Sequence, residues 1–411
     1  MKVKRMKYVL TIVLAVALVL SMAACGNNNQ PAPPPPPPAN GDNGDNGNGE
    51  APSGEPILIG INYEQSGPVA SFGIQSVHGV QMAVAEINEA GGVLGRPVQY
   101  ILMDNNSDPM EAYQIATRMM TRDGVVGIIG PATSGNFGAT IPAAMAHRVP
   151  MVTGSATRDN LIYDGAGNLS YFAFRICFRD AYQGTAMATF AFNYKDARRA
   201  ALIIMVDTDY SVGLAASFRE TFTDMGGEIV IEEGYVTGDQ HFSPILTRIN
   251  ATDFDVIFVP GYYNEVSQII RQAREMGITV PILGGDGFDS PRLLDIAGPE
   301  ALNNVFFSTH YSSLDEDPVV LDFIDRWRAK HGEDPSSFNA SGYDAAMFLF
   351  DAIRRAGTDD PVAIRDAMAA TVGFQGVTGT ITIDEFHNAV KPVVVVEIAN
   401  GVQVSSVRVP L

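Results

Sequence analysis

Short runs of β-branched and other apolar residues alternate along most of this chain with longer segments of helical periodicity. Runs without polar alternation indicate strands that are buried on both faces of a sheet. They lie at 57–62, 98–104, 125–130, 149–155, 200–207, 255–261 and 280–285. Because helix-length segments separate these runs, we expect parallel sheets with helices on both faces, and therefore an α/β fold. Ligands of such folds bind beyond the carboxyl ends of the strands.

The first 25 residues follow a different pattern. Basic residues at positions 2, 4, 5 and 7 precede the stretch Val9–Leu20, which is apolar apart from Thr11. At about 1.5 Å per residue, a helix of this length is shorter than the ~30 Å hydrocarbon core of a membrane and is typical of a signal peptide. Small residues then precede Cys25 in a segment that resembles the lipobox of bacterial lipoproteins. We predict a lipoprotein signal peptide over 1–25 with lipidation of Cys25; the alternative is a plain secretory signal with an accidental cysteine.

Residues 26–54 are rich in Pro, Gly and Asn and include the run Pro33–Pro38. They contain no aromatic or branched aliphatic residue. Such a segment cannot bury enough apolar surface to offset the entropy lost on ordering. We expect a disordered tether, stiffened by the proline run, that holds the folded part away from its anchor.

Composition excludes several classes of protein. The chain has 411 residues, which is enough for about two domains. Its 27 Lys and Arg stand against 46 Asp and Glu, a formal charge of −19, whereas nucleic-acid binding depends on an excess of basic side chains. The 2 cysteines exclude a disulfide scaffold and a four-cysteine zinc site.

Sequence motifs of catalysis and metal binding are missing. Gly130–Phe137 has the G-x-x-x-x-G spacing of a phosphate loop, but Asn and Phe stand where Lys and Ser or Thr are required. Asp104–Asp108 begins like a calcium loop, but Pro109 replaces the turn glycine and Ile115 replaces the bidentate Glu. The six histidines have no metal-ligand spacing, and neither HExxH nor GxSxG occurs. We therefore predict no enzyme, no cofactor and no metal site.

Two loops at strand ends suggest a site for a carboxylate. Thr133-Ser134 lies between a strand and a helix expected to start near Asn136, and Ser155-Ala156-Thr157 follows the next strand. Hydroxyl groups and free N–H groups at a helix N-terminus favour a negatively charged ligand. The alternative is that Ser134 and Thr157 merely cap helices.

A series of short motifs runs in order through residues 56–400. They are Gly67-Pro68, Gly91–Gly95, Asp104…Asp108-Pro109, Gly130-Pro131, Gly154–Thr157, Asp209-Tyr210, Gly261–Tyr263, Gly284–Gly287 and Ser341–Asp344. In order and spacing, the series resembles the branched-chain amino acid substrate-binding proteins of ABC transporters. The resemblance implies the type I periplasmic-binding-protein fold, with two doubly wound parallel-sheet lobes that are joined by a three-strand hinge and close on a ligand.

The resemblance also implies a domain organisation and a function. The N-terminal lobe would comprise 55–176 plus 309–388, and the C-terminal lobe 177–308 plus 389–411. We expect an extracytoplasmic, monomeric protein, attached to the membrane through its lipid anchor only. It would capture a branched-chain or related aliphatic amino acid and deliver it to an ABC transporter permease. The alternative is a sensory or uptake receptor of the same fold for amides, urea or aromatic acids.

Site residues follow from the resemblance position by position. Ser134 and Thr157 would bind the α-carboxylate of the ligand. The Ser155 carbonyl, in the same loop as Ala156, would accept from its ammonium group. The second lobe and the side-chain pocket would contribute Tyr210 and Asp286 at the ammonium, and Phe72 and Tyr262 around the side chain. Each of the last three has a plainer alternative: Asp286 as a turn residue, Phe72 as core, and Tyr262 as a rim aromatic.

Three departures from the family pattern leave the exact ligand open. Members often have Glu at the position of Asp286, and many have an aromatic residue with a polar tip at the position of Phe72. The disulfide of the family's first lobe would fall at about Ser107 and Thr133, so this chain lacks it. Cys177 remains as a solitary thiol, expected to be buried rather than reactive.

Overall fold

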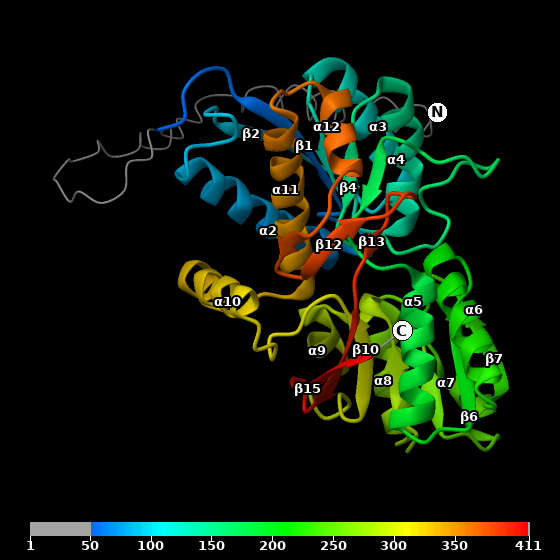
Figure 1. Cartoon of the computed structure of the whole chain (residues 1–411). Coiled ribbons are helices and arrows are strands. Elements are labelled where there is room, and N and C mark those ends of the chain that lie inside the picture. The colour runs from blue at the N-terminus through cyan, green and yellow to red at the C-terminus, as the bar shows by residue number, and fades with distance from the viewer. Residues whose placement is uncertain (1–50, 410–411) are drawn as a thin grey trace, which may run out of the picture. The chain divides into compact units, whose positions relative to one another are not determined.

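The computed structural model describes residues 51–409 (Figure 1). The signal peptide, Cys25 and tether residues 26–50 therefore lie outside the described residues. The last four tether residues are described, and the Ser53 N–H donates to the Gly95 carbonyl at 2.9 Å. Among the described residues, no helix is long and apolar enough to cross a membrane.

The first lobe is built on a parallel five-stranded sheet with the order β2-β1-β3-β4-β5. Its strands are β1 (Ile57–Tyr63), β2 (Val98–Asp104), β3 (Ile128–Ile129), β4 (Met151–Thr153) and β5 (Ala173–Arg175). Alternate residues enter two separate apolar clusters: Ile57, Ile59 and Ile61 face one cluster, while Leu58 packs against the other. Both faces of the sheet are therefore covered, as the unbroken apolar runs predict.

The second lobe is built on a seven-stranded sheet with the order β15-β14-β10-β9-β8-β6-β7. Its strands are β6 (Arg199–Met205), β7 (Glu228–Tyr235), β8 (Val256–Phe258), β9 (Ile282–Gly284), β10 (Val305–Thr309), β14 (Val393–Ala399) and β15 (Val402–Val409). The β6 to β10 part is parallel, but β14 and β15 are antiparallel. The doubly wound parallel architecture is confirmed, with this antiparallel edge as an addition. A two-residue turn, Asn400-Gly401, joins β14 to β15, and tight turns connect only antiparallel strands.

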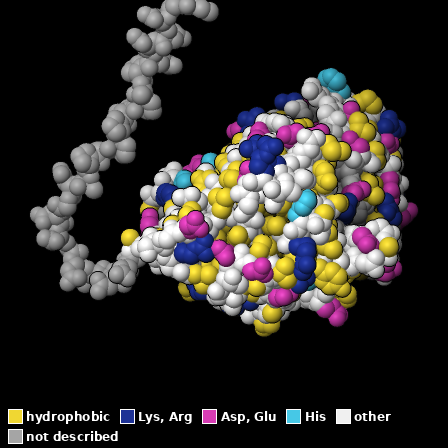
Figure 2. Space-filling model, turned by 90° about the horizontal axis from the view of Figure 1, so that it is seen from above, with side chains coloured by type: hydrophobic (Ala, Val, Ile, Leu, Met, Phe, Trp, Pro, Cys, Tyr) yellow, Lys and Arg dark blue, Asp and Glu magenta, His cyan; other side chains and the backbone are white. Residues whose placement is uncertain are grey.

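Helices cover both sheets. Those associated with the first sheet are α2 (Ala70–Glu89), α3 (Pro109–Arg118), α4 (Ser134–His147), α10 (Pro318–His331), α11 (Ser337–Ala356) and α12 (Pro361–Ala369), with a π-helical turn η1 (Met119–Asp123) after α3. Those of the second lobe are α5 (Asp180–Thr189), η2 (Phe190–Tyr194), α6 (Asp209–Asp224), α7 (Ser243–Asn250), α8 (Tyr263–Glu275), η3 (Asp286–Phe288) and α9 (Pro291–Ala297). In the space-filling view of Figure 2, acidic and basic side chains are interspersed over the visible face.

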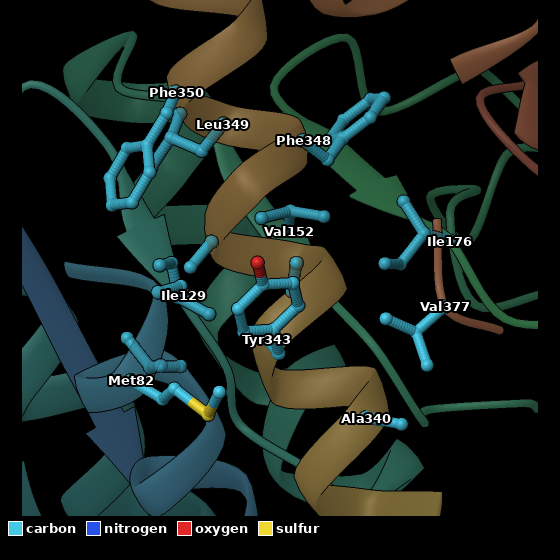
Figure 3. Packing of buried hydrophobic residues seen from close by; sticks show 14 of the residues in the cluster. Met82, Ile129, Val152, Ile176, Ala340, Tyr343, Phe348, Leu349, Phe350 and Val377 are labelled. Atoms are coloured by element: carbon cyan, nitrogen blue, oxygen red, sulfur yellow. The ribbon is translucent and has the colours of Figure 1, made fainter. Parts of the chain in front are cut away.

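Helix α11 forms the centre of the first lobe's core. It begins with a capping box in which Ser336 and Asn339 exchange hydrogen bonds, and it ends before Gly357. Its Leu349 and Phe350 belong to the same buried cluster as the sheet residues Ile129 and Val152, all of which are labelled in Figure 3. Helix α2 packs alongside α11, so the two helices together cover one face of the first sheet.

The chain passes between the two lobes three times. The first crossover follows β5, the second follows β10, and the third joins β13 (Ala389–Val390) to β14. A small antiparallel sheet of β11 (Phe374–Gly376), β12 (Gly379–Ile383) and β13 leads into the third crossover. These crossovers bring the carboxyl ends of strands in both sheets to one cleft.

Candidate functional site

The cleft collects most of the site residues predicted from the sequence in one small cavity. Seven of the eight line it, namely Phe72, Ser134, Ser155, Thr157, Tyr210, Tyr262 and Asp286. The exception is Ala156: its N–H donates to Thr153 Oγ1 at 3.1 Å, and its carbonyl accepts from the Cys177 thiol at 3.3 Å. The cavity is completed by Ala132, Thr133, Gly287 and Phe338, which the sequence reasoning did not include among the ligand-binding residues.

The free volume of this cavity is about 10 Å³, which is room for about one water molecule. Residues of both lobes contribute to its wall. The lobes are therefore closed in this structure. A ligand as large as an amino acid enters only when they move apart.

Hydroxyl groups of the first lobe form one end of the cavity. Ser134 is the first residue of α4, and its Oγ accepts from the Arg158 N–H at 3.1 Å. Thr157 is buried, and its Oγ1 has no hydrogen-bond partner among the described residues. Neither side chain caps a helix, because α4 has no side-chain cap and Thr157 is followed by a loop. The capping interpretation is wrong for both residues.

Glu64 is a buried carboxylate beside this end of the cavity that sequence reasoning missed. It lies directly after β1 and accepts from the N–H groups of Ala132 and Thr133 at 3.0 and 3.1 Å. Thr133 Oγ1 and Asn136 Nδ2 also donate to it, each at 2.9 Å. The hydrogen-bond donors just before α4 are thus partly occupied by the Glu64 carboxylate. The N–H groups of the first turn of α4, beginning with Ser134, cannot be paired within the helix.

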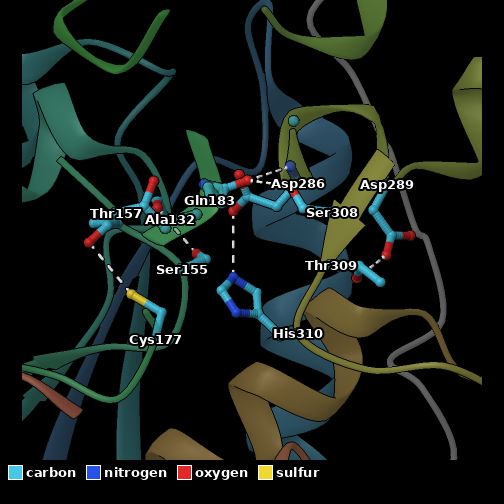
Figure 4. Close-up of polar contacts among 12 residues, drawn as sticks. Ala132, Ser155, Thr157, Cys177, Gln183, Asp286, Asp289, Ser308, Thr309 and His310 are labelled. Carbon is cyan, nitrogen blue, oxygen red and sulfur yellow. Dashed lines mark hydrogen bonds and ion pairs between the residues drawn. The ribbon is translucent and has the colours of Figure 1, made fainter. Parts of the chain in front are cut away.

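Asp286 forms the opposite end of the cavity from the second lobe. It begins η3, is separated from β9 by Gly285 alone, and is 3% exposed. Tyr210 Oη donates to Asp286 Oδ1 at 2.9 Å. The Asp286 N–H donates to Gln183 Oε1 at 2.9 Å, and Ser308 Oγ donates to the same oxygen at 2.7 Å (Figure 4). This network fixes the carboxylate against the first turn of α6, so Asp286 is more than a turn residue.

Aromatic rings form the wall between the two ends. The Phe72 ring stacks on Phe338 with centroids 4.4 Å apart and meets Tyr262 edge-on at 5.7 Å. The Tyr262 ring in turn stacks on Tyr210 at 5.1 Å. Phe72 belongs both to the core of the first lobe and to the cavity lining, so its two interpretations are compatible. The wall is apolar, which suits an aliphatic or aromatic side chain.

Burial shapes the protonation of groups around the cavity. It raises the pKa of Asp180 well above its usual range, and the nearby charge of Asp286 adds to the effect. Burial and the charge of Asp286 also raise the pKa of Tyr210, so its phenol stays a hydrogen-bond donor. Burial raises the pKa of the Cys177 thiol to about 12. Cys177 is thus the buried, unreactive thiol that its solitary position predicts.

Contacts between the lobes close the cleft on two sides. On one side, Ser71 Oγ lies 2.7 Å from Ser290 Oγ, and Tyr263 Oη accepts from the Ser71 N–H at 3.2 Å and donates to the Pro68 carbonyl at 3.1 Å. Elsewhere, Arg158 forms an ion pair with Asp209. Within residues 51–409, no group of three His, Cys, Asp or Glu side chains is placed to hold a metal ion.

Comparison with known proteins agrees with this architecture. The sequence matches the periplasmic binding protein family over residues 56–403. The Leu/Ile/Val-binding protein homolog 1 of Brucella suis is 30% identical over 335 residues, which are 80% of this chain and 86% of that protein. The leucine-, isoleucine-, valine-, threonine- and alanine-binding protein of Pseudomonas aeruginosa is 27% identical over 332 residues, again 80% and 86%.

A solved structure shares both the sequence pattern and the fold. The branched-chain amino acid transporter substrate-binding protein LivJ from Streptococcus pneumoniae, in complex with isoleucine, is 37% identical with a TM-score of 0.82. The match covers 86% of this chain and 99% of that one. The leucine-binding protein LivK from Thermotoga maritima is also 37% identical, with a TM-score of 0.79 over 85% and 98% of the two chains. The chain therefore belongs to the periplasmic binding protein family and has the type I fold of that family.

Proposed function

We propose that this chain is an extracytoplasmic, lipid-anchored solute-binding protein that captures an amino acid and delivers it to an ABC transporter permease. The observation that carries the proposal is the polarity of the cavity. Hydroxyl groups and a helix N-terminus lie at one end, the Asp286 carboxylate lies at the other, and aromatic rings lie between. This arrangement matches a zwitterion with an apolar side chain. The proposed function is binding and delivery, without chemistry on the ligand.

The roles of the site residues follow from this polarity. Ser134 Oγ, the N-terminus of α4 and Thr157 Oγ1 would bind the ligand's carboxylate, since each offers a hydrogen-bond donor without adding a positive charge. The Ser155 carbonyl and Asp286 would accept from the ammonium group, and the Tyr210 ring would lie against it. Phe72, Phe338 and Tyr262 would surround the side chain. Ala156 would act only by holding the loop.

A branched-chain amino acid is the proposed ligand. Relatives at 30% identity are named for binding leucine, isoleucine and valine, and the neighbour at 37% identity holds isoleucine. The aromatic wall of Phe72 and Phe338 offers apolar surface to an aliphatic side chain, at about 25 cal/mol for each Å² buried. Since the two ends of the ligand would contact different lobes, binding would stabilise the closed state, which a permease can distinguish from the open one.

The lobes that move would be 55–176 plus 309–388 and 177–308 plus 389–411. Within the described residues, this division keeps each of the two large sheets in one body, apart from Thr309, the last residue of β10. It also places the three crossovers at the boundary. We further propose that the protein acts as a monomer, since one chain supplies both halves of the cleft.

Isothermal titration calorimetry tests the ligand. The mature chain should bind leucine, isoleucine or valine with measurable heat. Asp286→Asn should weaken that binding by about 2–5 kcal/mol, because it leaves a buried ammonium without its charge partner. Asp253→Asn is a matched control on the same lobe, since Asp253 is 92% exposed. Absence of heat with every amino acid, but heat with an amide, urea or benzoate, would replace the proposed ligand class.

Membrane fractionation tests the anchor. Cys25→Ser should move the protein from the membrane to the soluble fraction, because the thiol that would carry the lipid is removed. Cys177→Ser is the control, since that thiol lies buried in the folded chain and should not affect attachment. Continued membrane attachment of Cys25→Ser would contradict the lipoprotein assignment.

A further inference from the structure

His310 lies at the point where the chain leaves the second sheet. It follows β10 directly and is 3% exposed. Its Nε2 lies 3.3 Å from Asp286 Oδ2, as Figure 4 shows. The other oxygen of the same carboxylate accepts from Tyr210. Each oxygen of Asp286 therefore has a separate side-chain partner from a different element.

The imidazole is held by the crossovers rather than by the second lobe alone. Its ring lies against Phe178, with centroids 3.9 Å apart and an interplanar angle of 31°. Phe178 belongs to the first crossover, between β5 and α5, while His310 belongs to the second. The next residue, Tyr311, packs into the core of the first lobe. The position of the imidazole therefore depends on the geometry of the hinge.

The surroundings of His310 favour a neutral ring. Burial lowers its pKa below the usual value; Asp286 opposes this shift, and the positive charge of Lys391 on the third crossover adds to it. Two further titratable groups lie near. The Cys177 thiol stays protonated, because its pKa is raised to about 12. Burial also raises the pKa of Asp180 well above its usual range, so titration of Asp180 can contribute to the pH dependence and is separated from that of His310 by NMR of the ring. An ionised carboxylate only accepts hydrogen bonds, so the neutral ring must carry its proton on Nε2.

We propose that His310 is a positioning residue for Asp286, which its Nε2–H holds in the orientation that receives the ligand's ammonium group. The inference rests on the proposed function. A neutral imidazole fixes the carboxylate and leaves its negative charge available to the ligand. Because the imidazole is carried by a crossover, a change in the hinge moves it relative to Asp286. The His310 side chain thereby couples hinge closure to the orientation of the Asp286 carboxylate.

The same contact makes binding sensitive to acid. A proton added to His310 places a positive charge beside Asp286, where it competes with the ligand's ammonium. Affinity should therefore be constant above the pKa of His310, which lies below about 6.5, and should fall as the pH drops through it. Lys391 stays positive over this range and cannot produce the change, because its pKa is about 8.

Two substitutions separate positioning from mere packing. His310→Gln retains an N–H donor of similar reach, whereas His310→Leu retains bulk without a donor. We expect His310→Leu to bind leucine about 10-fold more weakly at pH 7, and His310→Gln to bind within about 3-fold of the wild type. The wild type should lose affinity as the pH falls through the lowered pKa of His310, and neither variant should share that loss. His147→Gln, an exposed histidine of α4, is the control and should behave as the wild type.

The measurements are calorimetric titrations with leucine from pH 5 to 8 and NMR titration of the His310 ring in the wild type and in Asp286→Asn. If the contact exists, Asp286→Asn lowers the pKa of His310, whether or not any ligand binds. An unchanged pKa, or a His310→Leu protein that binds with the affinity and pH profile of the wild type, would overturn the proposal. If the wild type binds no amino acid, the proposed function fails, and the NMR arm still decides the contact. If His310→Leu does not fold, the NMR titration of the wild type and Asp286→Asn still tests the contact.

Discussion

At the scale of single residues, buried polar groups define the cleft and the hinge. Lys391 is 5% exposed in the third crossover, and its Nζ donates to Thr378 Oγ1 at 2.6 Å. Thr378 Oγ1 donates in turn to Asp344 at 2.6 Å. Burial lowers the pKa of Lys391 to about 8, since removal from water disfavours the charged form. The hinge thus contains a lysine whose loss of hydration is only partly offset by the nearby charge of Asp344.

This lysine should leave a signature in the pH dependence of stability. Between pH 8 and about 10.5 the unfolded chain binds the proton that the folded chain has lost, so the free energy of unfolding rises with pH. The contribution is on the order of 3 kcal/mol for a pKa difference of this size. Denaturant unfolding from pH 7.5 to 10.5 should show the rise in the wild type and not in Lys391→Met. Lys330→Met, at an exposed position of α10, should retain it. Equal slopes in all three would contradict the burial of the charge.

Residue-level prediction from sequence locates cavity-lining side chains that follow strand ends, but it does not find pairings between residues that are distant in the chain. Ser134, Thr157 and Asp286 are recognisable from local position and family pattern. Glu64 is local in the same way, just after β1, but its four donors come from residues about 70 positions away. His310 reaches Asp286 only because three crossovers meet. Neither pairing has a signal in a single sequence, although a Glu directly after a buried strand is a candidate for a buried carboxylate near the site.

At the scale of elements, the contact between α2 and α11 depends on small residues. A Cβ on Gly342 of α11 would overlap the Ser76 carbonyl of α2, and one on Gly79 of α2 would overlap the Asn339 carbonyl of α11. The two helices therefore approach backbone to backbone. This close approach lets both helices cover the same face of the first sheet.

Gly342→Ala should separate these helices and destabilise the first lobe. Overpacking of this kind typically costs about 1–3 kcal/mol, which exceeds the gain of up to ~1 kcal/mol in helix propensity. Thermal unfolding followed by circular dichroism measures the difference. Gly135→Ala in α4 is the matched control, because a Cβ there meets nothing within 4 Å and should cause no loss. A Gly342→Ala protein as stable as the wild type would show that the helices can move apart freely.

The apolar runs identify seven strands, including edge strand β2, but they miss edge strand β5 and also β10, which lies inside the second sheet. Each of the apolar runs taken as a strand contains one, and all of these strands pair in parallel. Edge strand β7 is missed because Glu232 and Glu233 interrupt its apolar run and most of its residues are only partly buried. The run Val393–Val396 is equally apolar but was not recognised, and its antiparallel pairing with β10 depends on the crossover that precedes it. Edge and return strands depend on topology more than on local pattern.

At the scale of the whole molecule, the lobes meet through aromatic packing of Phe72 against Tyr262 and Tyr263 and through a few polar contacts. Tyr263 Oη joins the start of α2 to the second lobe through the Ser71 N–H and the Pro68 carbonyl. The ion pair of Arg158 and Asp209 is substantially exposed and should contribute at most about 1 kcal/mol. A single substitution at these contacts should therefore shift the equilibrium between the open and closed states measurably.

Tyr263→Phe should shift that balance toward the open state. The loss of two hydrogen bonds, at about 0.5–1.5 kcal/mol each, should weaken ligand binding by roughly 5- to 150-fold. Small-angle X-ray scattering should show a larger radius of gyration without ligand and a wild-type radius at saturating ligand. Tyr171→Phe, which alters a 54% exposed ring, should change neither quantity. A compact ligand-free Tyr263→Phe protein would assign closure to other contacts.

The two buried carboxylates that flank the cleft have a metabolic consequence. Glu64 and Asp286 surround the cavity with negative charge, and Glu64 already occupies donors that an anionic ligand would need. A 2-oxo acid has the carbon skeleton of a branched-chain amino acid but carries no ammonium group to offset these charges. Such a cleft would select the nitrogen-bearing form of a nutrient and leave its deaminated counterpart in the medium. Uptake through such a cleft would then supply nitrogen together with carbon.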